Sequence, residues 1–211
     1  MYLYGTVRTY LEAASAGSPT PGGGSVAALA GALGMSMACM AANFTVGKKK
    51  FKDVEPEVKK HLEICLQARD ELLRLMDEDT KAYATVSEAY GMAKDTEEQR
   101  AARTQAIQHA LVVAMDAPLR TLRACREALR SVSKLADAAN PNLISDVGVA
   151  AILADAALRA AKLNVEINLQ SLKDEALVAA TRREIEEAVR EAGALVRGTL
   201  EKVVRAIGGT L

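Results

Sequence analysis

One acidic side chain stands among apolar ones in the long segment that follows Pro56. Asp79 continues a series of apolar residues at three- and four-residue spacing and is flanked in that series by Met76 and Tyr83. Helical spacing therefore predicts that its carboxyl faces the core. Burial disfavours a charged carboxylate and raises its pKa, which suits a general acid or base. The alternative is a structural acid that pairs with a core Arg or Lys.

A second polar group follows later in the chain, in an otherwise apolar segment. It consists of Ser145, Asp146, Asn164 and Asn168. The two asparagines are four residues apart and share one helix face, where amides either satisfy buried backbone or bind a ligand. Asp146 precedes Asn164 by 18 residues, so it shares that face but lies about 27 Å away along a straight helix. Asp146 is thus a second candidate acid, at the other end of the same element.

A glycine-rich loop supplies a third candidate site, at Gly22, Gly23, Gly24 and Ser25. Two prolines precede these residues, so the loop excludes a regular element and then opens a helix. The start of a helix offers free N–H groups and a positive dipole end, which suit an anionic or carbonyl-rich ligand. The pattern matches neither G-x-G-x-x-G nor the P-loop, and a plain helix-entry loop is the alternative.

The uncharged run that follows this loop ends at Asn43 and then at three lysines, Lys48, Lys49 and Lys50. Lysines are stable at the end of a helix and can attract a carboxylate, although a solvated helix end is the ordinary interpretation. Ser25 and Asn43 are again 18 residues apart, so the loop and the lysines lie at opposite ends of one helix. If both groups contact one ligand, a neighbouring subunit must complete the site. We therefore expect a homodimer.

The elements that carry these residues all have helical patterns. We expect helices over about 6–15, 25–46, 55–90, 96–115, 118–139, 145–172 and 174–207, with Ser145 as an N-cap, a capping box at Thr96 and the last helix beginning at Asp174. Gly31 and Gly34 are small enough to let neighbouring helices approach closely. The expected fold is all-α, a single domain over residues 1–211 built as a bundle of long helices around a central Ala/Gly-rich helix.

Composition excludes several other classes of function. Lys plus Arg and Asp plus Glu both number 27, and this balance gives no basic surface for nucleic acid. His61 and His109 lack metal-ligand spacing, so we expect no metal and interhelical or surface roles for both. The uncharged residues 26–46 reach transmembrane length, but their Ala and Gly content favours a core helix over a membrane span. Three separated cysteines fit reduced thiols in a cytoplasmic protein without a signal peptide: Cys39, Cys65 and Cys125.

Taken together, these segments resemble the cyclodeaminase domain family. That family includes the C-terminal domain of formiminotransferase-cyclodeaminase and stand-alone methenyltetrahydrofolate cyclohydrolases. The segments that carry the resemblance follow the family order over most of the chain: 21–29, 43–51, Asp79 with Tyr83, 117–119, 145–146 and 164–169. The resemblance implies an all-α fold, a dimeric unit, a folate substrate, and neither metal nor cofactor.

The resemblance also implies chemistry at the carbon of 5,10-methenyltetrahydrofolate. Asp146 or Asp79 would move the proton, and the backbone of residues 22–25 would hold the ligand against the helix start. The remaining candidate binding residues are polar: Asn164, Asn168 and Asn43 for the pterin, Ser145 beside Asp146, and Lys48, Lys49 and Lys50 for the glutamate tail.

Which reaction the chain performs stays open at this point. A chain without a formiminotransferase domain favours the cyclohydrolase. The cyclodeaminase is the first alternative, and a helical interaction module without catalysis is the second.

Overall fold

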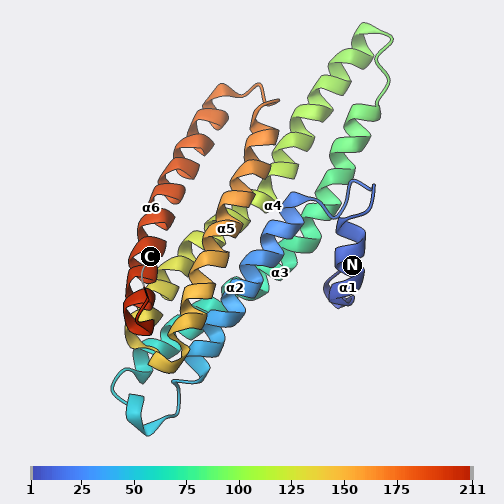
Figure 1. Cartoon of the computed structure of the whole chain (residues 1–211). Coiled ribbons are helices and arrows are strands. Elements are labelled where there is room, and N and C mark those ends of the chain that lie inside the picture. The colour runs from blue at the N-terminus through green and yellow to red at the C-terminus, as the bar shows by residue number, and fades with distance from the viewer. Residues whose placement is uncertain (1, 210–211) are drawn as a thin grey trace.

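The computed structural model describes residues 2–209, which form six α-helices and three short 3₁₀ turns, with no strand in this range (Figure 1). The α-helices are α1 (Val7–Ala14), α2 (Gly23–Asn43), α3 (Glu55–Gly91), α4 (Glu97–Ala138), α5 (Ile144–Leu169) and α6 (Glu175–Ile207). The 3₁₀ turns are η1 (Tyr2–Tyr4), η2 (Lys49–Phe51) and η3 (Pro141–Leu143). The expected all-α bundle of long helices is confirmed.

The Ala/Gly-rich helix α2 packs against α3, α4 and α5, and α6 covers α4 and α5 from outside. Helices α2 and α5 run antiparallel, since Gly23 of α2 lies beside Asn164, Gly31 beside Ala157 and Gly34 beside Leu153. The start of α2 therefore meets the end of α5, and the end of α2 meets the start of α5. The tip of the α3–α4 hairpin projects beyond the other helices (Figure 1).

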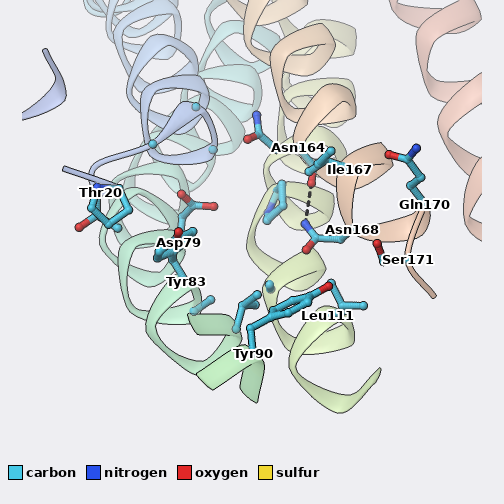
Figure 2. Close-up of a pocket in the computed structure, with 18 residues that line it drawn as sticks. Thr20, Asp79, Tyr83, Tyr90, Leu111, Asn164, Ile167, Asn168, Gln170 and Ser171 are labelled. Carbon is cyan, nitrogen blue, oxygen red and sulfur yellow. Dashed lines mark hydrogen bonds between the residues drawn. The ribbon is translucent and has the colours of Figure 1, made fainter. Parts of the chain in front are cut away.

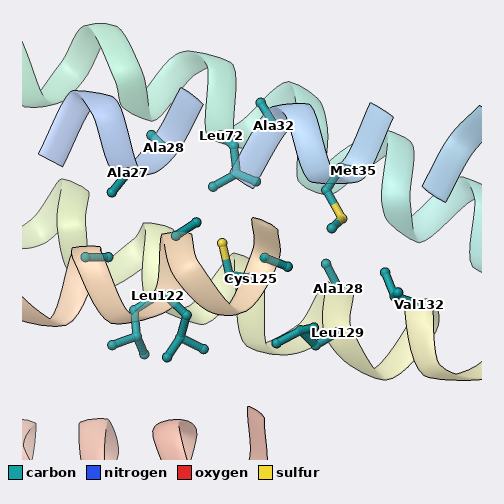
Figure 3. Packing of buried hydrophobic residues seen from close by; sticks show 14 of the residues in the cluster. Ala27, Ala28, Ala32, Met35, Leu72, Leu122, Cys125, Ala128, Leu129 and Val132 are labelled. Carbon is teal, nitrogen blue, oxygen red and sulfur yellow. The ribbon is translucent and has the colours of Figure 1, made fainter. Parts of the chain in front are cut away.

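Small side chains let these helices approach closely in the core (Figure 3). Fully buried alanines of α2 and α5 face larger residues of α3 and α4, such as Leu72, Leu122 and Leu129. A Cβ atom at Gly34 would lie 3.1 Å from the carbonyl oxygen of Ala150. The glycine thus sets the distance between the α2 and α5 backbones.

Two expected boundaries are wrong. Residues 97–138 form one continuous helix through Pro118, where we expected a break before the proline. A proline removes one helical hydrogen bond, but α4 packs along α3 and α5 on both sides of it, and this packing outweighs the lost bond. Ser145 is not an N-cap, because α5 begins one residue earlier at Ile144. The capping box at Thr96 is confirmed. The last helix begins next to Asp174 as expected, and Asp174 is its N-cap.

The two histidines and the three cysteines lie away from the candidate site residues Asp79, Asn164 and Asn168. His61 Nδ1 lies 3.2 Å from the hydroxyl of Ser131, so this histidine joins α3 to α4 as an interhelical residue. His109 is exposed. The three cysteines are buried and free, in agreement with reduced thiols: Cys39, Cys65 and Cys125.

One face of the bundle stays apolar and exposed. It is formed by α2 and α5 and is called here the α2/α5 face; its large exposed residues are Val26, Leu33, Val149, Ile152, Leu163 and Ile167. Within residues 2–209, α2 alone is long and apolar enough to cross a membrane, and 61% of its most apolar window is buried inside the bundle. A helix that is apolar on all sides is normally covered on all sides. The exposed side of α2 departs from this pattern.

The close contact at Gly34 gives a stability prediction. Gly34→Ala should lower the free energy of unfolding by about 1–3 kcal/mol, because the new methyl group pushes against the α5 backbone. Gly198→Ala, in α6 with open space around the position, is the matched control and should raise stability by about 0.5–1 kcal/mol. Urea titration of both variants measures the two changes. Equal effects of the two substitutions would contradict the packing argument.

Candidate active site

A cavity of about 420 Å³ opens where the start of α2 meets α3, α4 and the end of α5 (Figure 2). Its polar wall is formed by Thr20, the backbone of residues 22–24, Asp79, Asn164 and Asn168, with Gln170 and Ser171 at the edge. Its apolar wall consists of Tyr83, Val86, Tyr90, Leu111, Pro118 and Ile167. Seven candidate residues from the sequence therefore meet here. Six of them line the cavity, and Ser25 lies directly behind the lining, where its backbone contacts Asp79.

Asp79 is held at the start of α2. Its Oδ2 atom accepts a hydrogen bond of 2.9 Å from the backbone N–H of Ser25, which has no acceptor within its own helix. The N-cap residue, Gly22, has no side chain to do this, so a carboxylate from α3 satisfies the helix end instead. A Cβ atom at Gly24 would overlap the Asp79 carboxyl, so a side chain at this position would displace the carboxyl from where it lies.

Burial sets the electrostatics of this carboxyl. Desolvation raises the pKa of Asp79 above its usual value, and the hydrogen bond from Ser25 opposes the rise in part. Within residues 2–209, no Arg or Lys pairs with this carboxylate, so the alternative of a structural ion pair is wrong. A carboxyl with a raised pKa exchanges its proton closer to neutral pH, as acid–base catalysis requires.

Two amides face the carboxyl from the end of α5 (Figure 2). Asn164 donates from Nδ2 to the carbonyl of Ala160 at 2.9 Å, and Asn168 donates to the carbonyl of Asn164 at 2.8 Å. Each amide nitrogen thus fixes its side chain on its own helix. The amide oxygens stay available as acceptors toward the cavity.

Aromatic and apolar side chains close the other side of the cavity. Tyr90 and Leu111 lie across one end of it (Figure 2). The guanidinium of Arg103 lies over the Tyr90 ring, 5.6 Å from its centroid, and donates to the carbonyl of the same residue at 3.0 Å. Pro118 has no N–H, so the carbonyl of Ala114, which also lines the cavity, lacks its helical donor. A flat aromatic ligand with polar edges fits this combination of walls.

The remaining candidate residues lie at the opposite end of the bundle. Asn43 ends α2 and Asp146 lies in the first turn of α5, about 30 Å along α2 from Gly23. The lysines and Ser145 are exposed, and Lys50 borders a second cavity of about 400 Å³ at this end. One chain therefore does not bring Asp146 and Asn164 into one site, as their 18-residue spacing predicted. Asp146 is likewise far from Asp79.

Sequence reasoning missed part of the lining. The apolar residues Tyr90 and Leu111 carry no signal that separates them from core or surface positions. Gln170 and Ser171 follow the end of α5, where polar residues are ordinary. Pro118 was identified, but as a helix boundary. Had a helix interior been expected at Pro118, the sequence would have indicated that the carbonyl of Ala114 has no helical donor.

Residues 6–187 match the protein family described as formiminotransferase-cyclodeaminase. The chain belongs to this family. It is 41% identical to a methenyltetrahydrofolate cyclohydrolase of Methylorubrum extorquens over 94% of this chain and 95% of that protein. It is 33% identical to the formimidoyltransferase-cyclodeaminase of Rattus norvegicus over 94% of this chain, which spans 37% of that longer protein.

Solved structures agree with this membership of the formiminotransferase-cyclodeaminase family. The fold superposes on a formiminotetrahydrofolate cyclodeaminase of Thermotoga maritima with a TM-score of 0.78 and 32% identity, covering 96% of both chains. The relatives thus carry two different names, one for a hydrolytic reaction and one for a deamination. Both kinds of relative match nearly the whole of this chain.

The buried carboxyl gives a prediction for stability against pH. Because the pKa of Asp79 is raised in the folded state, its contribution favours folding below the usual aspartate pKa of about 3.9 and is lost as pH rises through the raised value. Asp79→Asn keeps an oxygen for the Ser25 N–H but removes the charge. The variant should therefore gain stability relative to the wild type as pH rises above the usual aspartate pKa of about 3.9.

Denaturant titrations at several pH values measure this difference. Asp53→Asn, which makes the same change of charge at an exposed position, is the control. A stability difference between Asp79→Asn and the wild type that stays flat with pH, or falls, would contradict the raised pKa.

Proposed function

We propose that this protein is a folate enzyme of one-carbon metabolism that hydrolyses 5,10-methenyltetrahydrofolate to 10-formyltetrahydrofolate. The observation that carries the proposal is the cavity at the start of α2, in which Asp79 is the one charged residue of the described lining. The family membership and the 41% identity to a cyclohydrolase support the same substrate class. The reaction needs acid–base chemistry, for which we propose no metal, cofactor or nucleic acid.

In the proposed reaction, Asp79 acts twice. As a carboxylate, it takes a proton from water while the water oxygen bonds to the methenyl carbon, which lies between N5 and N10. As an acid, it returns that proton to N5 when the bond from carbon to N5 breaks. The remaining hydroxyl proton leaves to solvent as the carbonyl forms, which gives the formyl group on N10. The methenyl bridge is a cation, so the same carboxylate also stabilises the bound substrate. A pKa raised by burial suits both proton transfers.

The pterin ring would lie between the two walls of the cavity. Tyr90 and Leu111 offer apolar contact to its faces, and the oxygens of Asn164 and Asn168 accept from its N–H edge. The N–H groups of Gly23 and Gly24 have no acceptor within α2, since a helix leaves its first donors free. They suit a carbonyl oxygen of the pterin.

The second candidate reaction is the cyclodeamination of 5-formiminotetrahydrofolate. The 32% identity over 96% of both chains to the Thermotoga maritima cyclodeaminase favours it. There Asp79 would take the proton from N10 as it attacks the formimino carbon, and would give it to the departing ammonia. Both reactions use the same cavity and the same carboxyl, so the substrate decides between them.

We also propose that the active unit is a homodimer in the cytoplasm, joined through the α2/α5 face. Val26, Leu33, Ile152 and Leu163 are large apolar residues that a second copy would cover, and α2 carries no charged residue. A two-fold axis across antiparallel α2 and α5 would bring the far end of the partner toward the cavity. Lys48, Lys49, Lys50, Asn43, Ser145 and Asp146 of that copy would then hold the glutamate tail and its surroundings.

An absorbance assay tests the reaction, because methenyltetrahydrofolate absorbs in the near ultraviolet, whereas 10-formyltetrahydrofolate and 5-formiminotetrahydrofolate do not. Asp79→Asn should lower kcat at least 100-fold with a small change in KM, since general acid–base groups contribute about 10²–10⁴-fold. Asp146→Asn is the matched comparison at the other end of the bundle and should change KM more than kcat.

Loss of absorbance when methenyltetrahydrofolate is added identifies the cyclohydrolase. An increase in absorbance when 5-formiminotetrahydrofolate is added identifies the cyclodeaminase. Unchanged turnover in Asp79→Asn would refute the assigned role. No turnover of either substrate by the wild type would favour a helical module without catalysis.

The dimer is tested by charge on its proposed interface. Leu33→Glu together with Ile152→Glu should yield a monomer in analytical ultracentrifugation and should raise KM at least 10-fold, because the partner's lysines are lost. Val112→Glu adds a charge at an exposed apolar residue of α4 outside this face and should leave mass and kinetics unchanged. A wild-type monomer with full activity would contradict the composite site.

A further inference from the structure

A polar contact behind the cavity joins α1 to the start of α2. Tyr10 is the one buried residue of α1, with 5% of its surface exposed, whereas Val7 and Leu11 on the same helix are exposed. Its hydroxyl lies 2.9 Å from the hydroxyl of Ser25, in a buried contact between residues 15 positions apart. The buried side chain of Tyr10 thus contacts Ser25, the residue whose backbone N–H donates to Asp79.

Ser25 serves two partners with two different groups. It is fully buried, and its backbone N–H donates to Asp79 Oδ2 while its hydroxyl contacts Tyr10. Rotation about the Cα–Cβ bond of Ser25 can turn its hydroxyl away from Tyr10 and toward the carboxylate that its own N–H already contacts. The Tyr10 hydroxyl opposes that rotation, because it offers the buried serine a hydrogen-bond partner on the other side.

We propose that Tyr10 is a positioning residue for the acid–base group: it keeps the Ser25 hydroxyl turned away from Asp79, so that the carboxylate receives one hydrogen bond from the described chain. This inference rests on the proposed function of Asp79, which it deepens. A second hydrogen bond would stabilise the charged carboxylate and move its proton exchange to lower pH. Tyr10 thereby keeps the proton exchange of Asp79 in the pH range where it can work as both base and acid.

The N-terminal segment is held so that Tyr10 stays in place. The backbone N–H of Tyr2 donates to Asp77 Oδ1 at 3.1 Å, and the Tyr2 ring meets the Tyr10 ring edge to face with centroids 5.5 Å apart. Asp77 is buried two residues before Asp79 on α3. Burial raises the pKa of Tyr10, and the neighbouring acids raise it further, so its hydroxyl keeps its proton through the neutral range.

Few other groups can titrate around Asp79. The lining residues of α2, α4 and α5 carry no ionisable side chain in the described part of the chain. The groups that remain are Tyr10 on α1, Tyr2 on η1, and Asp77, Tyr83 and Tyr90 on α3. A change in the titration of Asp79 on removal of the Tyr10 hydroxyl can therefore be traced to the Ser25 contact.

The test is a carbon-13 NMR titration of the Asp79 carboxyl in the ligand-free protein, with the signal assigned by its loss in Asp79→Asn. Tyr10→Phe should lower the midpoint by about half a unit to one unit, the size of one net hydrogen bond. Ser25→Ala and the double variant Tyr10→Phe/Ser25→Ala should both keep the wild-type midpoint, because neither has a serine hydroxyl that can turn.

The pair of variants separates positioning from simple disturbance of the fold. An unchanged midpoint in Tyr10→Phe overturns the proposal, and so does an equal shift in the double variant. In the absorbance assay, the acidic limb of the kcat profile should move with the NMR midpoint. If Asp79→Asn keeps full turnover, the proposed function fails, but the NMR comparison still decides the role of Tyr10.

Discussion

The hydrogen bond from the Ser25 N–H to Asp79 connects the fold to the candidate chemistry. It exists because a glycine-rich segment begins α2 without a side-chain cap, so that a carboxylate from α3 occupies the helix end. Gly24 leaves room for the carboxyl, since a methyl group there would overlap Oδ1 and displace it. The close packing of α2 against α3 and α5 holds this arrangement, and the same packing buries the carboxyl and raises its pKa.

The two ends of α2 carry different parts of one proposed site. The first end supplies the carboxyl, the amides and the aromatic wall in a single chain, which is enough for the proton transfers. The second end carries the lysines that we propose for the carboxylate tail, about 30 Å away along the helix. The exposed apolar face between these ends supports the proposed second copy, because one partner could both cover that face and complete the proposed site.

Much of this arrangement could be predicted from the sequence. Helical periodicity predicted the long helices, and the position of Asp79 within an apolar series predicted a buried acid whose pKa is raised. The spacing of Asn164 and Asn168 predicted a shared face, which the cavity confirms. Pro118 was misinterpreted because local propensity was allowed to decide, whereas packing on both neighbours keeps α4 continuous. Tyr10 and Tyr90 could not be assigned, since their roles depend on which distant residue they contact.

A crystal structure with bound 5-formyltetrahydrofolate, a stable folate that carries its carbon at N5, tests the central claim most directly. The account predicts that the formyl group lies within about 3 Å of an Asp79 oxygen, a distance suited to proton transfer, with the pterin between Tyr90 and Asn168. The glutamate tail should point toward Lys48–Lys50 of a second copy. A formyl group beside Asp146, with the cavity at Asp79 empty, would contradict the account.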